Sequence, residues 1–89
     1  MTEYNGYKNY NTWNIVLWIH NDENAYQYLM QQVKIHQKFN YFWNPVLAKK
    51  TALEIMRSCF NKPETPDRVK VSSKDIDWKQ VSDALNENI

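Results

Sequence analysis

The chain has a single glycine, Gly6, and three prolines among its 89 residues. Tight β-hairpin turns depend on glycine or on small polar residues at positive φ, so this composition leaves few places for hairpins. Apolar residues recur at helical spacing instead, and Trp13, Val16 and Leu17 lie at i, i+3 and i+4. The sequence therefore predicts an all-α fold, a compact bundle of about four helices in one domain that spans residues 1–89.

Short polar side chains mark the expected helix starts, because they accept hydrogen bonds from the free N–H groups of a first turn. The helices are expected near residues 10–19, 22–37, 45–60 and 76–86. Their caps are expected to be Asn9 or Asn11, Asn21, Asn44 with Pro45 behind it, and Asp75. A polar loop should join the last two helices. Within it, apolar and charged residues alternate near residues 68–71, which could form one short strand.

A chain of this length buries only about two thirds of its unfolded surface, so its core must be rich in large apolar side chains. Four Trp, six Tyr and three Phe supply that bulk. The residues expected to form the core are Trp13, Val16, Leu17, Trp18, Leu29, Val33, Leu53, Met56, Phe60, Trp78, Val81 and Leu85, with Val46 beside them.

Two tryptophans of the first helix are expected to contact different parts of the core. Residues five apart on a helix point about 140° away from each other, so Trp13 and Trp18 cannot share one narrow face. We expect Trp13 to pack inside the bundle against Trp78, and Trp18 to reach the second or third helix. Trp13→Ala should then cost about 3–5 kcal/mol, enough to leave a small domain largely unfolded.

The net charge of +1 argues against a strongly basic nucleic-acid binder. The charge is unevenly spread, because residues 31–60 carry five basic side chains against the single acidic Glu54. Cys59 is the only cysteine, so no intramolecular disulfide can form. The first residues lack a basic region followed by an apolar run, and the longest apolar stretch, residues 15–19, is far too short to span a bilayer. A cytoplasmic protein without membrane contact is expected.

Metal binding and catalysis find little support in the sequence. His20, His36 and Cys59 show none of the ligand spacings of metal sites, and no glycine-rich turn would expose Cys59 as a nucleophile. The paired carboxylates in residues 22–23 and 75–77 fall at expected helix starts, where capping explains them. A single glycine also excludes a glycine-rich phosphate loop. We expect no metal, no cofactor and no enzymatic activity.

Two classes of binding function remain. Tyrosines outnumber what a four-helix core can hide, and Tyr, Trp and Arg are enriched at protein interfaces. Cations with aromatic residues between them are also typical of single-strand nucleic-acid binding, which neutralises phosphates and stacks bases. The residues expected to contact a partner are Tyr7, Lys34, Lys38, Tyr41, Trp43, Lys49, Lys50 and Arg57. A homodimer that buries the spare aromatic side chains stays open.

Two segments follow a pattern known from other proteins. The first is Gly6-Tyr7-Lys8-Asn9-Tyr10-Asn11-Thr12-Trp13, continued by Leu17-Trp18 and Asn21-Asp22-Glu23. The second is Asp77-Trp78-Lys79-Gln80-Val81, leading to Leu85. Together they resemble a family of small uncharacterised proteins from phages, plasmids and some bacterial genomes. The chain departs from that pattern at Asn11, where an acidic residue is common, and at Asn24, where glycine is common.

The resemblance implies a mobile-element setting and no known activity. Small proteins in such a setting often bind and inhibit a host protein, including defence complexes such as CRISPR effectors; this step is an analogy. We therefore expect a non-enzymatic protein-binding module that inhibits a host protein or nucleoprotein complex. The alternative is a single-stranded nucleic-acid-binding protein that uses the cationic middle third.

Overall fold

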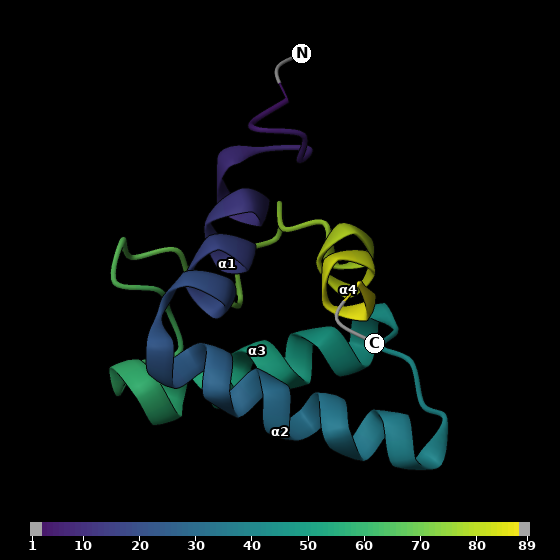
Figure 1. The fold of residues 1–89 in the computed structure, drawn as a ribbon. Coiled ribbons are helices and arrows are strands. Elements are labelled where there is room, and N and C mark those ends of the chain that lie inside the picture. The colour runs from purple at the N-terminus through teal and green to yellow at the C-terminus, as the bar shows by residue number, and fades with distance from the viewer. Residues whose placement is uncertain (1–2, 88–89) are drawn as a thin grey trace.

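Four helices account for most of residues 3–87, the part of the chain that the computed structural model describes (Figure 1). They are α1 (Tyr10–Asn21), α2 (Glu23–Phe39), α3 (Pro45–Phe60) and α4 (Trp78–Asn86). The all-α fold that the sequence predicts is confirmed. No helix within these residues is long and apolar enough to cross a membrane.

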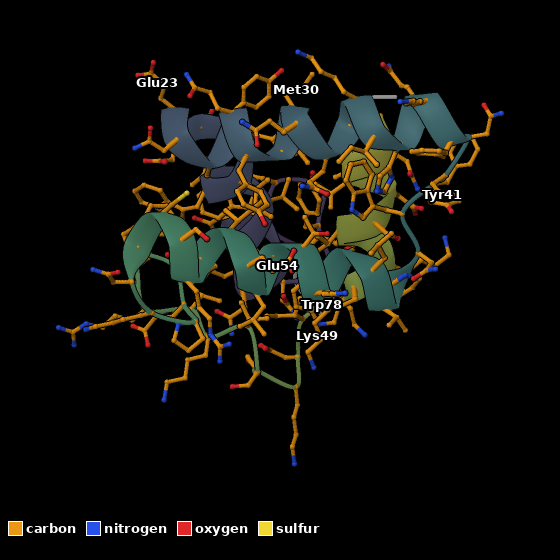
Figure 2. The ribbon with its side chains drawn as sticks, turned by 90° about the horizontal axis from the view of Figure 1, so that it is seen from below. Glu23, Met30, Tyr41, Lys49, Glu54 and Trp78 are labelled. Atoms are coloured by element: carbon orange, nitrogen blue, oxygen red, sulfur yellow. The ribbon has the colours of Figure 1, made fainter. Side chains whose placement is uncertain are left out.

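The helices are arranged as a pair with two further helices on one of its faces. α2 and α3 lie side by side, and α1 and α4 pack against the same face of that pair (Figures 1 and 2). Residues 40–44 join α2 to α3 at one end of the pair. Residues 61–77 lead from the other end of α3 back to α4. The two connections therefore lie at opposite ends of the molecule.

Asp22 joins α1 directly to α2. Its backbone N–H closes α1 by donating to the Trp18 carbonyl oxygen over 3.2 Å, and its carboxylate caps α2 by accepting from the Ala25 N–H over 3.0 Å. The cap expected from the sequence, Asn21, is instead the last residue of α1. Because a capping residue needs non-helical backbone, the cap falls on Asp22, which is extended.

The other helix starts agree with the sequence in two cases of three. Asn9 caps α1 and Asn44 caps α3, each accepting a backbone N–H in the first turn. Asp77 caps α4, and the expected cap Asp75 does not. The Asp75 carboxylate accepts a hydrogen bond from Asn11 of α1 instead. The cap of α4 is therefore the next carboxylate along the chain, Asp77.

The core lies between the α2–α3 pair and the two helices on its face. Its largest fully buried apolar side chains are Ile15, Ile19, Leu29, Ile55, Met56, Val33, Val71, Val81 and Leu85. Among the residues expected there, Val16, Leu29, Val33, Met56, Val81 and Leu85 are buried. Trp18, Leu53, Phe60 and Trp78 pack against them half-buried. Trp18 reaches α3, as the sequence predicts, and its ring centroid lies 5.8 Å from that of Phe60.

Trp13 does not pack inside the bundle against Trp78, and the prediction was wrong there. Its half-exposed ring lies against Tyr4 and Tyr10, with centroids 4.7 and 5.5 Å away. α1 buries the face that carries Ile15, which is fully enclosed. Residues two apart on a helix point about 200° away from each other, so burial of Ile15 turns Trp13 outward.

Leu17 and Val46 also lie outside the core, for the same geometrical reason. Leu17 follows Ile15 by two residues and is only half-buried. Val46 precedes the fully buried Ala48 by two residues and is 81% exposed. The sequence pattern shows that both helices are amphipathic, but it does not show which stripe faces the neighbours.

The segment between α3 and α4 contains the strand-like stretch that the sequence suggests. Val69 and Val71 are buried, whereas Arg68 and Lys70 are exposed. This stretch pairs with the residues just after α3 in a short hairpin-like turn, in which Glu64 and Lys70 form an isolated antiparallel bridge. Arg68 takes the left-handed turn position with φ of 68°. Residues 63–65 are the partner that could not be found from the sequence.

Candidate functional site

The buried side chain of Asn14 on α1 forms hydrogen bonds with the long connection between α3 and α4. The side chain is fully buried, and its Nδ2 donates to Asp67 Oδ2 over 2.8 Å and to the Tyr10 hydroxyl over 3.2 Å. Its Oδ1 accepts from the Thr65 hydroxyl over 2.7 Å. Trp18 Nε1 donates to the same Asp67 oxygen over 2.9 Å. These hydrogen bonds lower the pKa of Asp67, the bond from Asn14 having the largest effect.

A second set of contacts holds the start of α4 against the start of α1. The Thr12 hydroxyl accepts from the Asp77 backbone N–H over 2.9 Å and donates to Asn9 Oδ1 over 2.7 Å. Asn9 Nδ2 donates to the Asp75 carbonyl oxygen over 2.6 Å. Asn11 Nδ2 donates to both Asp75 carboxylate oxygens, over 3.0 and 3.1 Å. Hydrogen bonds from Ser73 and Asn11 lower the pKa of that carboxyl group.

The polar residues of the N-terminal pattern are thus used within the protein. Asn9, Asn11, Thr12 and Trp18 all bond to residues between 67 and 77, far away in the chain. Thr12 is buried and needs these hydrogen bonds, whereas Asn9 and Asn11 are partly exposed and join α1 to the segment before α4. These polar residues of the N-terminal pattern therefore have a structural role.

Large apolar side chains are exposed at the end of the molecule where α2 meets α3. We call this group the α2–α3 patch: Ile35 (46% exposed), Phe39 (56%), Tyr41 (58%), Phe42 (65%) and Val46 (81%). The rings of Phe39 and Tyr41 lie 6.0 Å apart, and Lys38 Nζ sits 5.6 Å from the centre of the Phe39 ring. Figure 2 shows Tyr41 at this end of the helix pair. Apolar groups gathered in this way are typical of a contact surface.

Trp43 was expected to contact a partner, but its side chain is only 3% exposed. The indole stacks on the His36 ring with centroids 3.8 Å apart, and its Nε1 donates to the Thr51 hydroxyl over 3.3 Å. The Asn86 side chain binds both backbone groups of Trp43: Oδ1 accepts from the N–H over 2.7 Å, and Nδ2 donates to the carbonyl oxygen over 2.8 Å. Trp43 therefore anchors the connection whose neighbouring residues form the patch.

His36 supports this anchor as a neutral ring. It is 5% exposed, and its Nδ1 is buried without a hydrogen-bond partner among the described residues. Burial lowers the pKa of the imidazole, because the charged form would lose its hydration. Sequence reasoning considered His36 only as a metal ligand and missed Asn86 altogether. A histidine and a terminal asparagine have no local pattern that would reveal such contacts.

The cationic residues expected to bind a partner divide between two places. Lys34, Lys38, Lys49 and Lys50 are exposed on the two helix ends that flank the patch. In Figure 2 Lys49 projects from the side of α3 that faces away from α2. Arg57 lies eleven residues beyond Val46, about 16 Å farther along α3, so it belongs to a different part of the surface.

Tyr7 precedes α1 and lies against α1 and the end of α4, whereas Tyr41 lies in the connection between α2 and α3. It lines a shallow groove of about 290 Å³ with Trp13, Leu17, His20 and Glu87, among others. Burial and the nearby Glu87 carboxylate raise the pKa of its hydroxyl. Tyr41 and the four lysines do not line this groove.

Residues 3–87 contain no cluster of the side chains that usually bind a metal ion. No group of three or more His, Cys, Asp or Glu side chains among them could hold a metal ion. Cys59 is half-buried against the core, and burial raises the pKa of its thiol, which disfavours the reactive thiolate.

These elements define a small α-helical protein with exposed aromatic side chains around the connection between α2 and α3. Residues 1–88 match the model of a family of unknown function, DUF7249, and the chain belongs to that family. No curated protein and no solved structure shows significant similarity to the chain.

Proposed function

We propose that the protein is a non-enzymatic protein-binding module and that the α2–α3 patch is its contact surface. The observation that carries the proposal is the gathering of five large apolar side chains, 46–81% exposed, around one helix–helix connection. Such side chains gain free energy when a partner removes them from water, at roughly 25 cal/mol per Å². Aromatic residues are also the commonest source of hot-spot energy at interfaces.

The rigidity of the connection favours this role. Trp43 is fixed by His36 on one side and by two hydrogen bonds from Asn86 on the other. Tyr41 and Phe42 are therefore displayed from an anchored backbone. A preorganised surface loses little conformational entropy when it binds, so more of the contact energy appears as affinity.

The setting that we propose rests on the resemblance of the sequence pattern to that of mobile-element proteins. In that setting the module is a cytoplasmic accessory protein of phage or plasmid origin. It binds and inhibits a host protein or a defence complex such as a CRISPR effector. The resemblance supports this part of the proposal, as an analogy to other small proteins of mobile elements.

A single-stranded nucleic-acid binder is the second candidate function. Tyr41 and Phe42 are exposed enough to stack on bases, and the exposed Lys38 lies three and four residues before them in the chain. This arrangement would neutralise phosphates beside a stacking surface. Trp43, which was expected to stack as well, is buried and cannot do so.

Affinity capture from a bacterial lysate tests the first candidate. The wild-type protein is compared with a Phe42→Ser/Val46→Ser variant, and Tyr26→Ser serves as the matched control because Tyr26 is exposed earlier on α2. We expect a protein that the wild type and the control retain and the patch variant loses. Equal capture by all three would show that the patch is not the contact surface.

Nuclease treatment and the dependence of binding on salt concentration distinguish the second candidate function from the first. Recovery of nothing but nucleic acid, with an affinity for oligo(dT) that falls steeply as salt rises, would favour strand binding. Thermal melting of each variant is measured in parallel, and unchanged melting shows that a lost contact is not a lost fold.

A further inference from the structure

The α2–α3 patch lies in a stretch of chain that carries only positive charge. Residues 24–53 contain four lysines, Lys34, Lys38, Lys49 and Lys50, and no Asp or Glu. All four are exposed. No carboxylate forms an ion pair with any of them in the part of the chain that the structure describes, where the ion pair found is Lys79–Asp83 on α4. This stretch is therefore rich in positive charge, and the nearest carboxylate along α3 is Glu54, four residues after Lys50.

Lysines lie close to apolar side chains of the patch on both helices. On α2, Lys34 and Lys38 stand next to Ile35 and Phe39 in the chain, and Lys38 reaches over the Phe39 ring. On α3, Lys49 and Lys50 follow Val46 by three and four residues, which places them on the same side of the helix one turn later. We call these four residues the lysine rim.

We infer that the partner bound by this surface is an acidic amphipathic segment of another protein. This inference rests on the proposed function and specifies the chemistry of its partner. Apolar side chains of the segment would cover the patch, and its Asp or Glu side chains would meet the lysine rim. Complementary charge of this kind speeds association and excludes wrong partners, while the α2–α3 patch supplies most of the affinity.

Two other occupants fit the surface less well. A second copy of the chain would bring four lysines toward four lysines, and facing like charges oppose association. A nucleic acid would use the rim and the rings, but the aliphatic Ile35 and Val46 offer nothing to phosphates or bases. The exposed aliphatic side chains therefore favour a protein segment.

Labelled peptides provide the test, with fluorescence anisotropy as the readout. The first peptide is an amphipathic helix with Leu and Phe on one face and Glu on the other. The second and third have Gln or Lys in place of every Glu, and single-stranded oligo(dT) is the nucleic-acid probe. We expect the Glu peptide to bind at least about tenfold more tightly than the Gln peptide at low salt, and the preference to shrink as salt rises.

Charge variants of the protein make the test specific. Lys38→Glu/Lys49→Glu/Lys50→Glu should reverse the preference, so that the Lys peptide binds better than the Glu peptide. The matched control, Lys70→Glu/Lys74→Glu, changes two exposed lysines far along the chain and should leave the preference for the Glu peptide in place. Phe42→Ser/Val46→Ser should abolish binding of all three peptides.

Several results would overturn the inference. Equal binding of the Glu and Gln peptides, or no binding of any peptide, would show that the partner is not an acidic segment. If lysate capture still depended on Phe42 and Val46, the proposed function would stand without it. Oligo(dT) binding that excludes the Glu peptide would identify a nucleic acid instead. Dimerisation that the Phe42→Ser/Val46→Ser variant loses, measured by sedimentation, would identify a second copy.

Discussion

Asn14 and Asp67 are joined by a 2.8 Å hydrogen bond across 53 positions of the chain, from the middle of α1 to the turn that follows α3. Asn14 is fully buried, while the Asp67 carboxylate lies at the surface and also accepts the Trp18 indole N–H. Through this contact α1 determines the path of a segment that has no helix of its own. The contact can be tested by removing either end.

Asn14→Ala should lower the unfolding free energy by about 2–3 kcal/mol, because the buried Thr65 hydroxyl loses its acceptor and the buried Asn14 side chain leaves a gap. For a domain of this size that corresponds to a melting temperature lower by roughly 10–20 °C. Urea denaturation followed by tryptophan fluorescence measures the change. Asn24→Ala, at an exposed position of α2, is the control and should melt like the wild type.

Trp18→Ala should destabilise the protein more than Trp13→Ala. Trp18 packs on Phe60 in the core and bonds to Asp67, whereas Trp13 packs on the exposed Tyr4 and Tyr10. We expect a cost of about 3–4 kcal/mol for Trp18→Ala and about 1–2 kcal/mol for Trp13→Ala. Thermal melting of the two variants side by side decides the order. If the Trp13→Ala protein is largely unfolded, Trp13 contributes to stability as a core residue would, as the sequence predicts.

Asn86→Asp should loosen the connection between α2 and α3 although the side chain keeps its shape. The aspartate can still accept from the Trp43 N–H but cannot donate to the Trp43 carbonyl oxygen. We expect a loss of about 1–2 kcal/mol and faster hydrogen exchange of the amides near Trp43. Exchange measured residue by residue would contradict this expectation if only the end of α4 responded.

His36 should make stability fall as the solution becomes acidic. Its pKa in the folded protein is lowered from the ordinary value of 6.5, so above that value both states carry a neutral ring and stability does not change. As the pH falls below it, the unfolded chain binds the proton first, and the unfolding free energy decreases. Denaturation curves between about pH 7.5 and 5 measure this slope.

The slope is assigned by comparing two variants. His36→Gln should be less stable at neutral pH, because the stack on Trp43 is lost, but its stability should vary less with pH. Asn24→Ala, which changes an exposed residue of α2 that does not titrate, is the control and should keep the slope of the wild type. An undiminished slope in His36→Gln would assign the pH dependence to another group. Asp67 and Asp75 cannot supply it, since their lowered pKa values act only in more acidic solution.

Part of the candidate site could be found from the sequence. The aromatic connection and its lysines were identified, because a run of aromatic residues between two amphipathic segments is visible in the chain itself. Tyr41 and Lys38 both lie close to the Phe39 ring. Tyr7 lies against α1 and α4, and Arg57 lies three turns farther along α3 than Val46. The sequence predicts an exposed Trp43, but the side chain is buried. Its exposure depends on the distant residues that pack against it.

The sequence by itself determined the helices, since helix formation depends on contacts between residues three or four apart and on caps within the same turn. The Asn44-Pro45 start of α3 is such a local feature. Only the tertiary structure decided which stripe of α1 faces inward, that Asp22 and Asp77 cap their helices, and that Asn86 holds Trp43. Polar groups that become buried when distant segments pack must find hydrogen-bond partners in those segments. A local sequence pattern does not show which partners these are.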